Sequence, residues 1–134
     1  MAMTVTVDEI LVADPPQAWT AAGFTVADGT SRVGDVAIRL VGRDRGTGII
    51  GWSLGGVDVG DLDGIPTTTS DAGHAVPAEH ANGVTGIDHI VLFSPDLDRT
   101  VSALAAVGVE PRRERLGELG GRAIRQIFFR FGAV

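Results

Sequence analysis

Cysteine is absent from this chain of 134 residues. A disulfide framework, a thiolate zinc site and a cysteine nucleophile are therefore excluded. No apolar run approaches the roughly 18–20 residues that span a bilayer. Residues 1–14 lack the basic start of a secretory signal, and their apolar residues alternate with polar ones. These absences predict a cytoplasmic protein that does not enter a membrane.

Positive charge is scarce. The eleven basic residues, all of them arginine, face 17 acids and leave a formal net charge of −6. This balance argues against a chain-wide surface for nucleic acid or for anionic lipid. The hydrophobic fraction of 44% and the charged fraction of 21% are ordinary for a soluble protein. The length predicts one domain, or two half-size modules that share a core.

Three regions differ in composition, and we expect them to be a module over residues 1–57, a linker over 58–83 and a module over 84–134. The middle region holds five acids and no arginine, and glycine, proline, serine and threonine occur throughout it. Such composition is typical of a linker or a long surface crossover. His74, Glu79 and His80 lie here. Pro77 separates the two histidines and no cysteine is near, so a solvated loop is favoured over a zinc site.

The first region predicts the order β-α-β-β-β. A strand is expected over residues 4–13, because valine and isoleucine recur there without a helix breaker. Asp14 before Pro15 predicts a helix start, and Gly23 predicts its end. Strands are expected over residues 24–27, 36–41 and 49–54, with Asp28 and Gly29 forming a turn.

The last region begins in the same order. A strand is expected over residues 86–93, and Ser94 with Pro95 repeats the cap-then-proline pattern before a helix that ends at Gly108. Two further strands are expected over residues 109–116 and 123–131. The chain then stops where a fourth strand would follow.

An internal repeat connects the two regions. Residues 7–15 align with residues 87–95 at a constant offset of 80, and residues 37–39 match residues 123–125. Chance similarity between two strand–helix units is the alternative, but the shared order of elements and the shared cap chemistry favour a duplication. The alignment places Glu9 opposite His89.

The segments over residues 86–92 and 94–100 resemble the opening of a module of the vicinal oxygen chelate superfamily, which includes glyoxalases and bleomycin-resistance proteins. The resemblance implies an α+β fold in which paired βαβββ modules form a curved mixed sheet around a cup. The second module would lack its fourth strand.

The same resemblance implies metal-ligand positions on the first and fourth strands of each module. His89 and Glu9 fall on the first-strand positions and are the candidate ligands of a divalent metal. Trp52 or Ser53 stands where a carboxylate is expected, so a third ligand is lacking. His89 has the alternative of a ring satisfied by the backbone or by Asp88.

Glu9 is also the candidate general base, provided that it faces the cup, where burial would raise its pKa. A place on the solvated face of the strand is the alternative. Trp52 and Phe93 are the candidate aromatic residues for a ligand pocket.

Three functions follow from the resemblance. The first is a metal-dependent lyase, isomerase or dioxygenase that acts on an oxygen-chelating substrate through Glu9 and His89. The second is a non-catalytic, drug-sequestering binder of small molecules, and the third is a structural remnant without a ligand. The sequence leaves open whether the protein is an enzyme.

The short ending predicts an unpaired strand edge near residues 126–131, apolar enough to associate. Either a neighbouring subunit covers this edge, which would make the protein a homodimer, or the chain is part of a longer protein.

Overall fold

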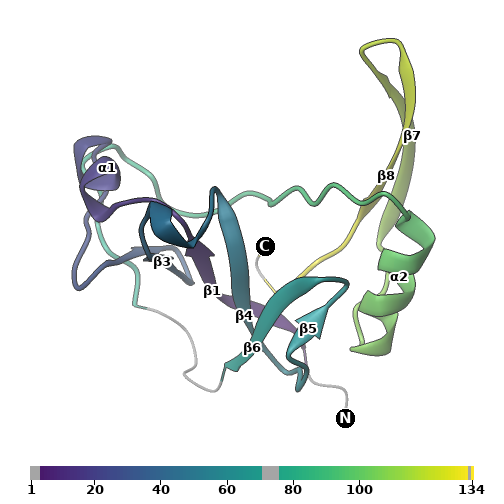
Figure 1. Ribbon diagram of the computed structural model, residues 1–134, viewed down its shortest axis with the longest axis horizontal. Coiled ribbons are helices and arrows are strands. Elements are labelled where there is room, and N and C mark those ends of the chain that lie inside the picture. Colours follow the sequence, from purple (N-terminus) through teal and green to yellow (C-terminus); the bar gives the residue numbers. More distant parts are fainter. Residues whose placement is uncertain (1–3, 71–75, 133) are drawn as a thin grey trace.

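The computed structural model describes residues 4–70, 76–132 and 134. The fold is α+β and has two parts: a mixed six-stranded sheet with a short helix at one side, and an arm that projects from the other side (Figure 1). The sheet part contains β1 (Thr6–Val12), α1 (Pro16–Ala21), β2 (Thr30–Val33), β3 (Val36–Leu40), the 3₁₀ turn η1 (Arg43–Arg45), β4 (Ile49–Gly55), β5 (Asp61–Leu62) and β6 (Ile65–Ser70). The arm contains α2 (Leu97–Ala106), β7 (Arg113–Leu119) and β8 (Arg122–Phe128).

The strands of the large sheet lie in the order β2-β3-β1-β4-β6-β5. β1 runs parallel to β3 and antiparallel to β4, and β4 runs parallel to β6. The predicted βαβββ order of the first region is confirmed. The position of its second strand was wrong, because Phe24 packs on Trp19 with ring centroids 4.5 Å apart and the strand begins only at Thr30, after the predicted turn.

A β-bulge in β1 decides which side chains enter the core. Val5 and Val7 are buried, and so are Ile10 and Val12, one residue out of step with strict alternation. The pairing of β1 with β4 shifts between Val7 and Glu9, which supplies the extra residue. The bulge keeps the apolar side chains on one face and turns Glu9 to the other.

The core lies against this face of β1, β3 and β4. It is made of aliphatic side chains from the sheet, together with Leu104 of α2 and Val109, which follows it. The arm is thereby joined to the sheet at its base, although most of β7 and β8 is exposed.

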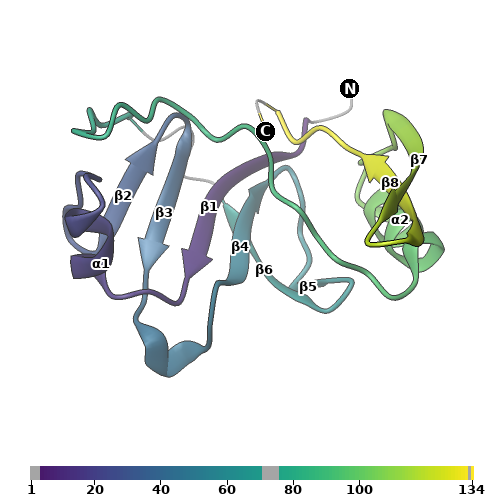
Figure 2. The ribbon, with the colours of Figure 1, turned by 90° about the horizontal axis from the view of Figure 1, so that it is seen from above.

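The predicted linker contains two strands of the sheet. β6 pairs with β4, and β5 forms the last strand at that edge. Residues 76–93 then cross from the α1 side of the sheet to the arm (Figures 1 and 2). His74 lies outside the described residues, and the division into three regions stays a prediction.

Hydrogen bonds fasten the beginning of this crossing segment to the sheet part. The His80 ring accepts the backbone N–H of Thr25 at 2.9 Å through Nδ1, and its Nε2 lies 2.9 Å from the Arg32 carbonyl. The Asn82 side chain donates to the Ala22 carbonyl at 3.1 Å. His80, expected in a solvated loop, therefore ties that loop to the turn after α1 and to β2.

Both helix starts differ in detail from the prediction. The N-cap of α1 is Pro15, not Asp14, whose carboxylate instead accepts from the Trp19 indole at 2.9 Å. The N-cap of α2 is Asp96, not Ser94, and its carboxylate accepts from the Arg99 backbone N–H at 3.1 Å. The Ser94 hydroxyl instead bonds to the Thr100 hydroxyl at 2.6 Å and accepts the Asp96 backbone N–H at 3.1 Å.

The strand predicted over residues 86–93 is wrong. This segment forms no helix or strand and has no strand partner among the described residues. The second region consequently shows a helix and two strands, and the pairing of two modules stays a prediction. No helix in the described part of the chain is long and apolar enough to cross a membrane.

The arm also differs from the sheet in charge. Residues 110–132 carry six arginines and three glutamates, a net charge of +3, whereas the chain as a whole carries −6. The remainder therefore carries −9.

Candidate functional site

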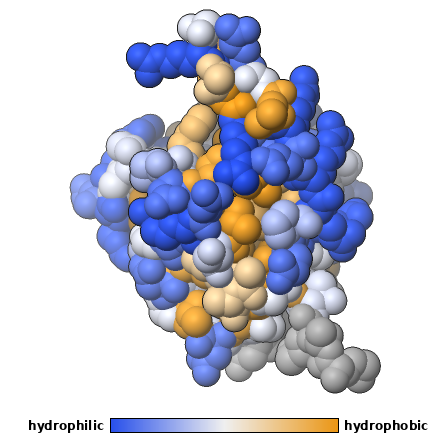
Figure 3. Space-filling view, turned by 90° about the vertical axis from the view of Figure 1, so that its right-hand side faces the viewer, coloured by the Kyte–Doolittle hydropathy of each residue, from blue (hydrophilic) through white to orange (hydrophobic). Residues whose placement is uncertain are grey.

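A cleft of about 420 Å³ lies between the sheet and the arm. Aliphatic and aromatic side chains supply most of its wall, and apolar surface is visible between hydrophilic patches on this side of the molecule (Figure 3). The apolar lining is Val7, Trp52, Leu62, Ile65, Ile90, Val91, Leu92, Leu97, Val101, Leu104, Ile127, Phe128, Phe129, Phe131 and Val134. The polar lining is Asp63, Asp88, His89, Ser94, Thr100, Arg125 and Gln126.

Trp52 joins the floor of the cleft to the C-terminal segment. It pairs with Ile10 across β1 and β4, so both side chains lie on the core face of the sheet. The Trp52 indole donates to the Thr67 hydroxyl at 2.9 Å, and its ring centroid lies 5.5 Å from that of Phe131. These contacts fix the largest aromatic surface of the floor.

Asp63 connects the turn between β5 and β6 to α2, which lie on opposite sides of the cleft. It lies in the turn between β5 and β6 with φ +53°, and its side chain is only 8% exposed. The carboxylate accepts from Arg99 Nε at 2.7 Å and from the Thr100 hydroxyl, both on α2. The Arg99 guanidinium, helped by the Thr100 hydroxyl, holds the pKa of Asp63 below its usual range, against the opposing effect of burial. The same contact raises the pKa of Arg99.

Arg125 carries the other strong ion pairs of the site. Its guanidinium donates to Glu114 of β7 and to Asp98 of α2, the latter at 2.9 Å, and these bonds raise its pKa. Two carboxylates thus surround one cation, so this group leaves one negative charge uncompensated.

The sequence-predicted ligands are not brought together. His89 lines the cleft, but its side chain is 71% exposed and bonds to Asp88 at 2.6 Å. Glu9 lies on the opposite face of the sheet from Trp52, since its neighbour Ile10 is the residue that pairs with Trp52. On that opposite face, Oε1 of the Glu9 carboxylate lies 3.6 Å from Nε of Arg39.

A divalent metal does not fit these residues. Within residues 4–70, 76–132 and 134, no group of three or more histidine and acidic side chains is placed to hold one. His89 has Asp88 as its acidic neighbour, while Glu9 is turned away. No catalytic step through a metal follows from this arrangement.

The two predicted aromatic residues have different positions. Trp52 lines the cleft, whereas Phe93 is 85% exposed and is not part of the lining. The sequence reasoning missed Asp63, which it assigned to the linker. The Asp-Gly pair at 63–64 marks a tight turn, but nothing local reveals that α2 packs against it.

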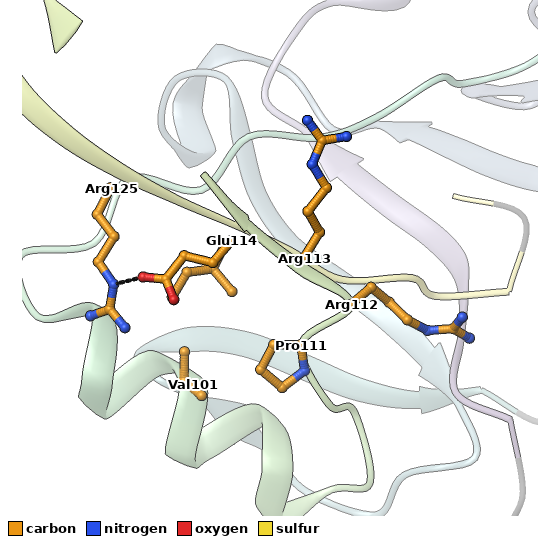
Figure 4. A pocket seen from close by; sticks show the side chains of 7 residues that line it. Val101, Pro111, Arg112, Arg113, Glu114 and Arg125 are labelled. Carbon is orange, nitrogen blue, oxygen red and sulfur yellow. Dashed lines mark hydrogen bonds and ion pairs between the residues drawn. The ribbon is translucent and has the colours of Figure 1, made fainter. Parts of the chain in front are cut away.

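A second, shallower hollow of about 280 Å³ lies between α2 and the hairpin of β7 and β8 (Figure 4). Arg112 and Arg113 point away from each other in this view, while Glu114 and Arg125 face each other. The arginines do not converge on a common point, and Arg113 instead lies 5.4 Å from the Phe128 ring centroid. The larger cleft is therefore the better candidate site.

Comparison with protein-family models, with curated proteins and with solved structures finds no match to this chain.

Proposed function

We propose that this protein binds a small apolar molecule in the cleft between the sheet and the arm, as a non-catalytic binding protein. The observation that carries the proposal is the lining: a concave space of about 420 Å³ with Trp52 and three phenylalanines among aliphatic side chains. Ligand sites typically combine such an apolar wall with a few polar groups. This corresponds to the drug-sequestering binder that the family resemblance implies.

The metal-dependent enzyme has less support. It requires Glu9 and His89 in one site, and they lie on different sides of the sheet. The proposal therefore assigns His89 to the polar rim of the cleft and gives Glu9 no part in ligand binding. A cytoplasmic location and a homodimer belong to the proposal only as predictions from the sequence.

A titration with the neutral apolar dye N-phenylnaphthylamine tests the proposal. Dye fluorescence should rise saturably, and Trp52→Ala should weaken binding by at least about tenfold, as expected when a large contact surface is removed. Trp19→Ala is the matched control, because Trp19 packs on Phe24 at the α1 side and does not line the cleft. Circular dichroism verifies that both variants fold.

Equal loss of binding in the two variants, or no saturable binding at all, would overturn the proposal. A second measurement does not depend on Trp52→Ala being folded. In Trp19→Phe, Trp52 is the only tryptophan, and bound dye should quench its emission by energy transfer. Unquenched Trp52 emission at saturating dye would place the dye elsewhere.

A further inference from the structure

We infer that the cleft also takes an extended peptide segment with apolar side chains and a basic residue, which adds as a β-strand to the free edge of β8. The inference rests on the proposed function, because the side chains of the peptide would occupy the same apolar cleft. It is carried by the backbone groups that border the cleft and by the charges at its rim.

β8 has one open edge. In the described residues it pairs with β7 alone, and the residues from Arg125 to Phe128 line the cleft whereas no residue of β7 does. The Phe128 carbonyl accepts the Arg112 backbone N–H at 2.8 Å and so points to the β7 side. Because these directions alternate along an antiparallel strand, the N–H and C=O groups of Arg125 and Ile127 point to the open edge.

The opposite wall also has unused backbone groups. Residues 88–92 line the cleft and belong to no helix, strand or turn, and no backbone hydrogen bond is formed by residues 86–93 within the described part of the chain. Backbone amides and carbonyls thus border the cleft on both sides. An extended peptide carries complementary donors and acceptors at the same repeat, and an exposed strand edge is a template for such pairing.

The chain's own segment does not close onto β8, because both ends of it are held. Gly34 packs against the backbone of Thr85 and Gly86 at one end. At the other end, Asp63 holds α2 through Arg99 and Thr100. A separate peptide reaches the open edge without breaking these contacts.

Charge at the rim favours a basic peptide. The Asp88 side chain is 95% exposed and has His89 as its neighbour, and Arg125 is outnumbered by its two carboxylate partners. Asp63 and Arg99 neutralise each other. Of the charged side chains that line the cleft, Asp63 and Asp88 are acidic and Arg125 is basic, so the lining itself carries a net charge of −1. A lysine beside the apolar part of the peptide complements this charge.

The test uses the peptide acetyl-Lys-Val-Thr-Val-Thr-Val-amide and its analogue N-methylated at alternate amides. Calorimetry and Trp52 emission in Trp19→Phe should both report binding of the first peptide. N-methylation removes the donors but keeps the apolar surface, so the analogue should bind at least about tenfold more weakly. Replacing the lysine by glutamate should weaken binding as well, increasingly so at low salt.

A matched pair of variants locates the peptide. Ile127 itself lines the cleft, so the readout is the ratio of the two affinities. Ile127→Pro removes the outward N–H of β8 and should weaken binding of the first peptide at least about tenfold more than binding of N-phenylnaphthylamine, which needs no backbone donor. Ile127→Val should leave this ratio unchanged. Equal binding of both peptides would show selection by shape alone, and dye binding without peptide binding would exclude a strand ligand. Either result overturns this inference and leaves the proposed function standing. If neither dye nor peptide binds, the proposed function fails with it. Self-association that excludes the peptide and is itself lost in Ile127→Pro would assign the open edge to a second copy and overturn the inference.

Discussion

At the scale of single residues, polar side chains hold distant segments of this chain together. Asp63 connects the turn before β6 to α2, and His80 connects the crossing segment to Thr25 and Arg32. Neither contact is encoded by local spacing. Each brings together residues that lie more than thirty positions apart, and each can be tested by a single substitution.

We predict that Asp63 makes the protein sensitive to acid. Because its pKa is lower in the folded chain than in the unfolded one, its stabilisation is present above the ordinary aspartate pKa and is lost as the pH falls through the folded value, below about pH 4. Asp63→Asn should lower the urea midpoint at about pH 7 and reduce the drop between about pH 7 and about pH 3. Urea titrations at the two pH values measure this. An unchanged drop in the variant would contradict the prediction.

The two described histidines form a natural comparison. His80→Ala removes two hydrogen bonds and should lower the free energy of unfolding by about 1–2 kcal/mol. His89→Ala removes a contact between two exposed side chains and should change it by less than about 0.5 kcal/mol. Chemical denaturation compares them, and similar effects from both would mean that residues 76–86 are not held by His80.

At the scale of elements, the sequence predicted what local pattern determines. Apolar runs, helix-ending glycines and the turn at Asp28 and Gly29 placed β1, α1, β3, β4 and α2 close to their observed bounds. The β6 segment was missed, because its proline and threonines are typical of loops and only the pairing with β4 makes it a strand.

Residues 86–93 show the opposite error. Their isoleucine, valine, leucine and phenylalanine favour a strand, but strand propensity describes fit to a sheet, and no neighbouring strand is present in the described residues. The prediction of the candidate site likewise depended on how the strands pair, which local sequence does not show. Glu9 was placed on β1 correctly, yet the face that it occupies is set by a bulge that no local pattern announces.

The hairpin of β7 and β8 depends on its two-residue turn. Gly120 and Gly121 have φ +58° and +79°, as a type I′ turn requires. Gly121→Val should destabilise the hairpin by about 1 kcal/mol or more, because a β-branched residue is strained there. Gly120→Asn should be tolerated. Hydrogen exchange of residues 113–128 reports the difference, and equal protection in the two variants would argue against this turn as the determinant.

At the scale of the whole molecule, the exposed apolar side chains of residues 91–93 predict self-association. Light scattering should give a mass that rises above the monomer value with concentration. Phe93→Asp, which places a charge on an 85% exposed side chain, should keep the protein monomeric without loss of stability. A wild-type monomer at every concentration, with the hairpin protected from hydrogen exchange, would contradict this prediction.

The basic arm gives the molecule a further property. With +3 on the projecting hairpin and its flanks and −9 on the remainder, the chain has a large permanent electric dipole directed along the arm. Such a molecule approaches charged surfaces in a preferred orientation, and low ionic strength strengthens the effect. On an anion-exchange resin the sheet part should face the matrix and the arm should point toward the mobile phase. A column therefore becomes a means of presenting the arm outward.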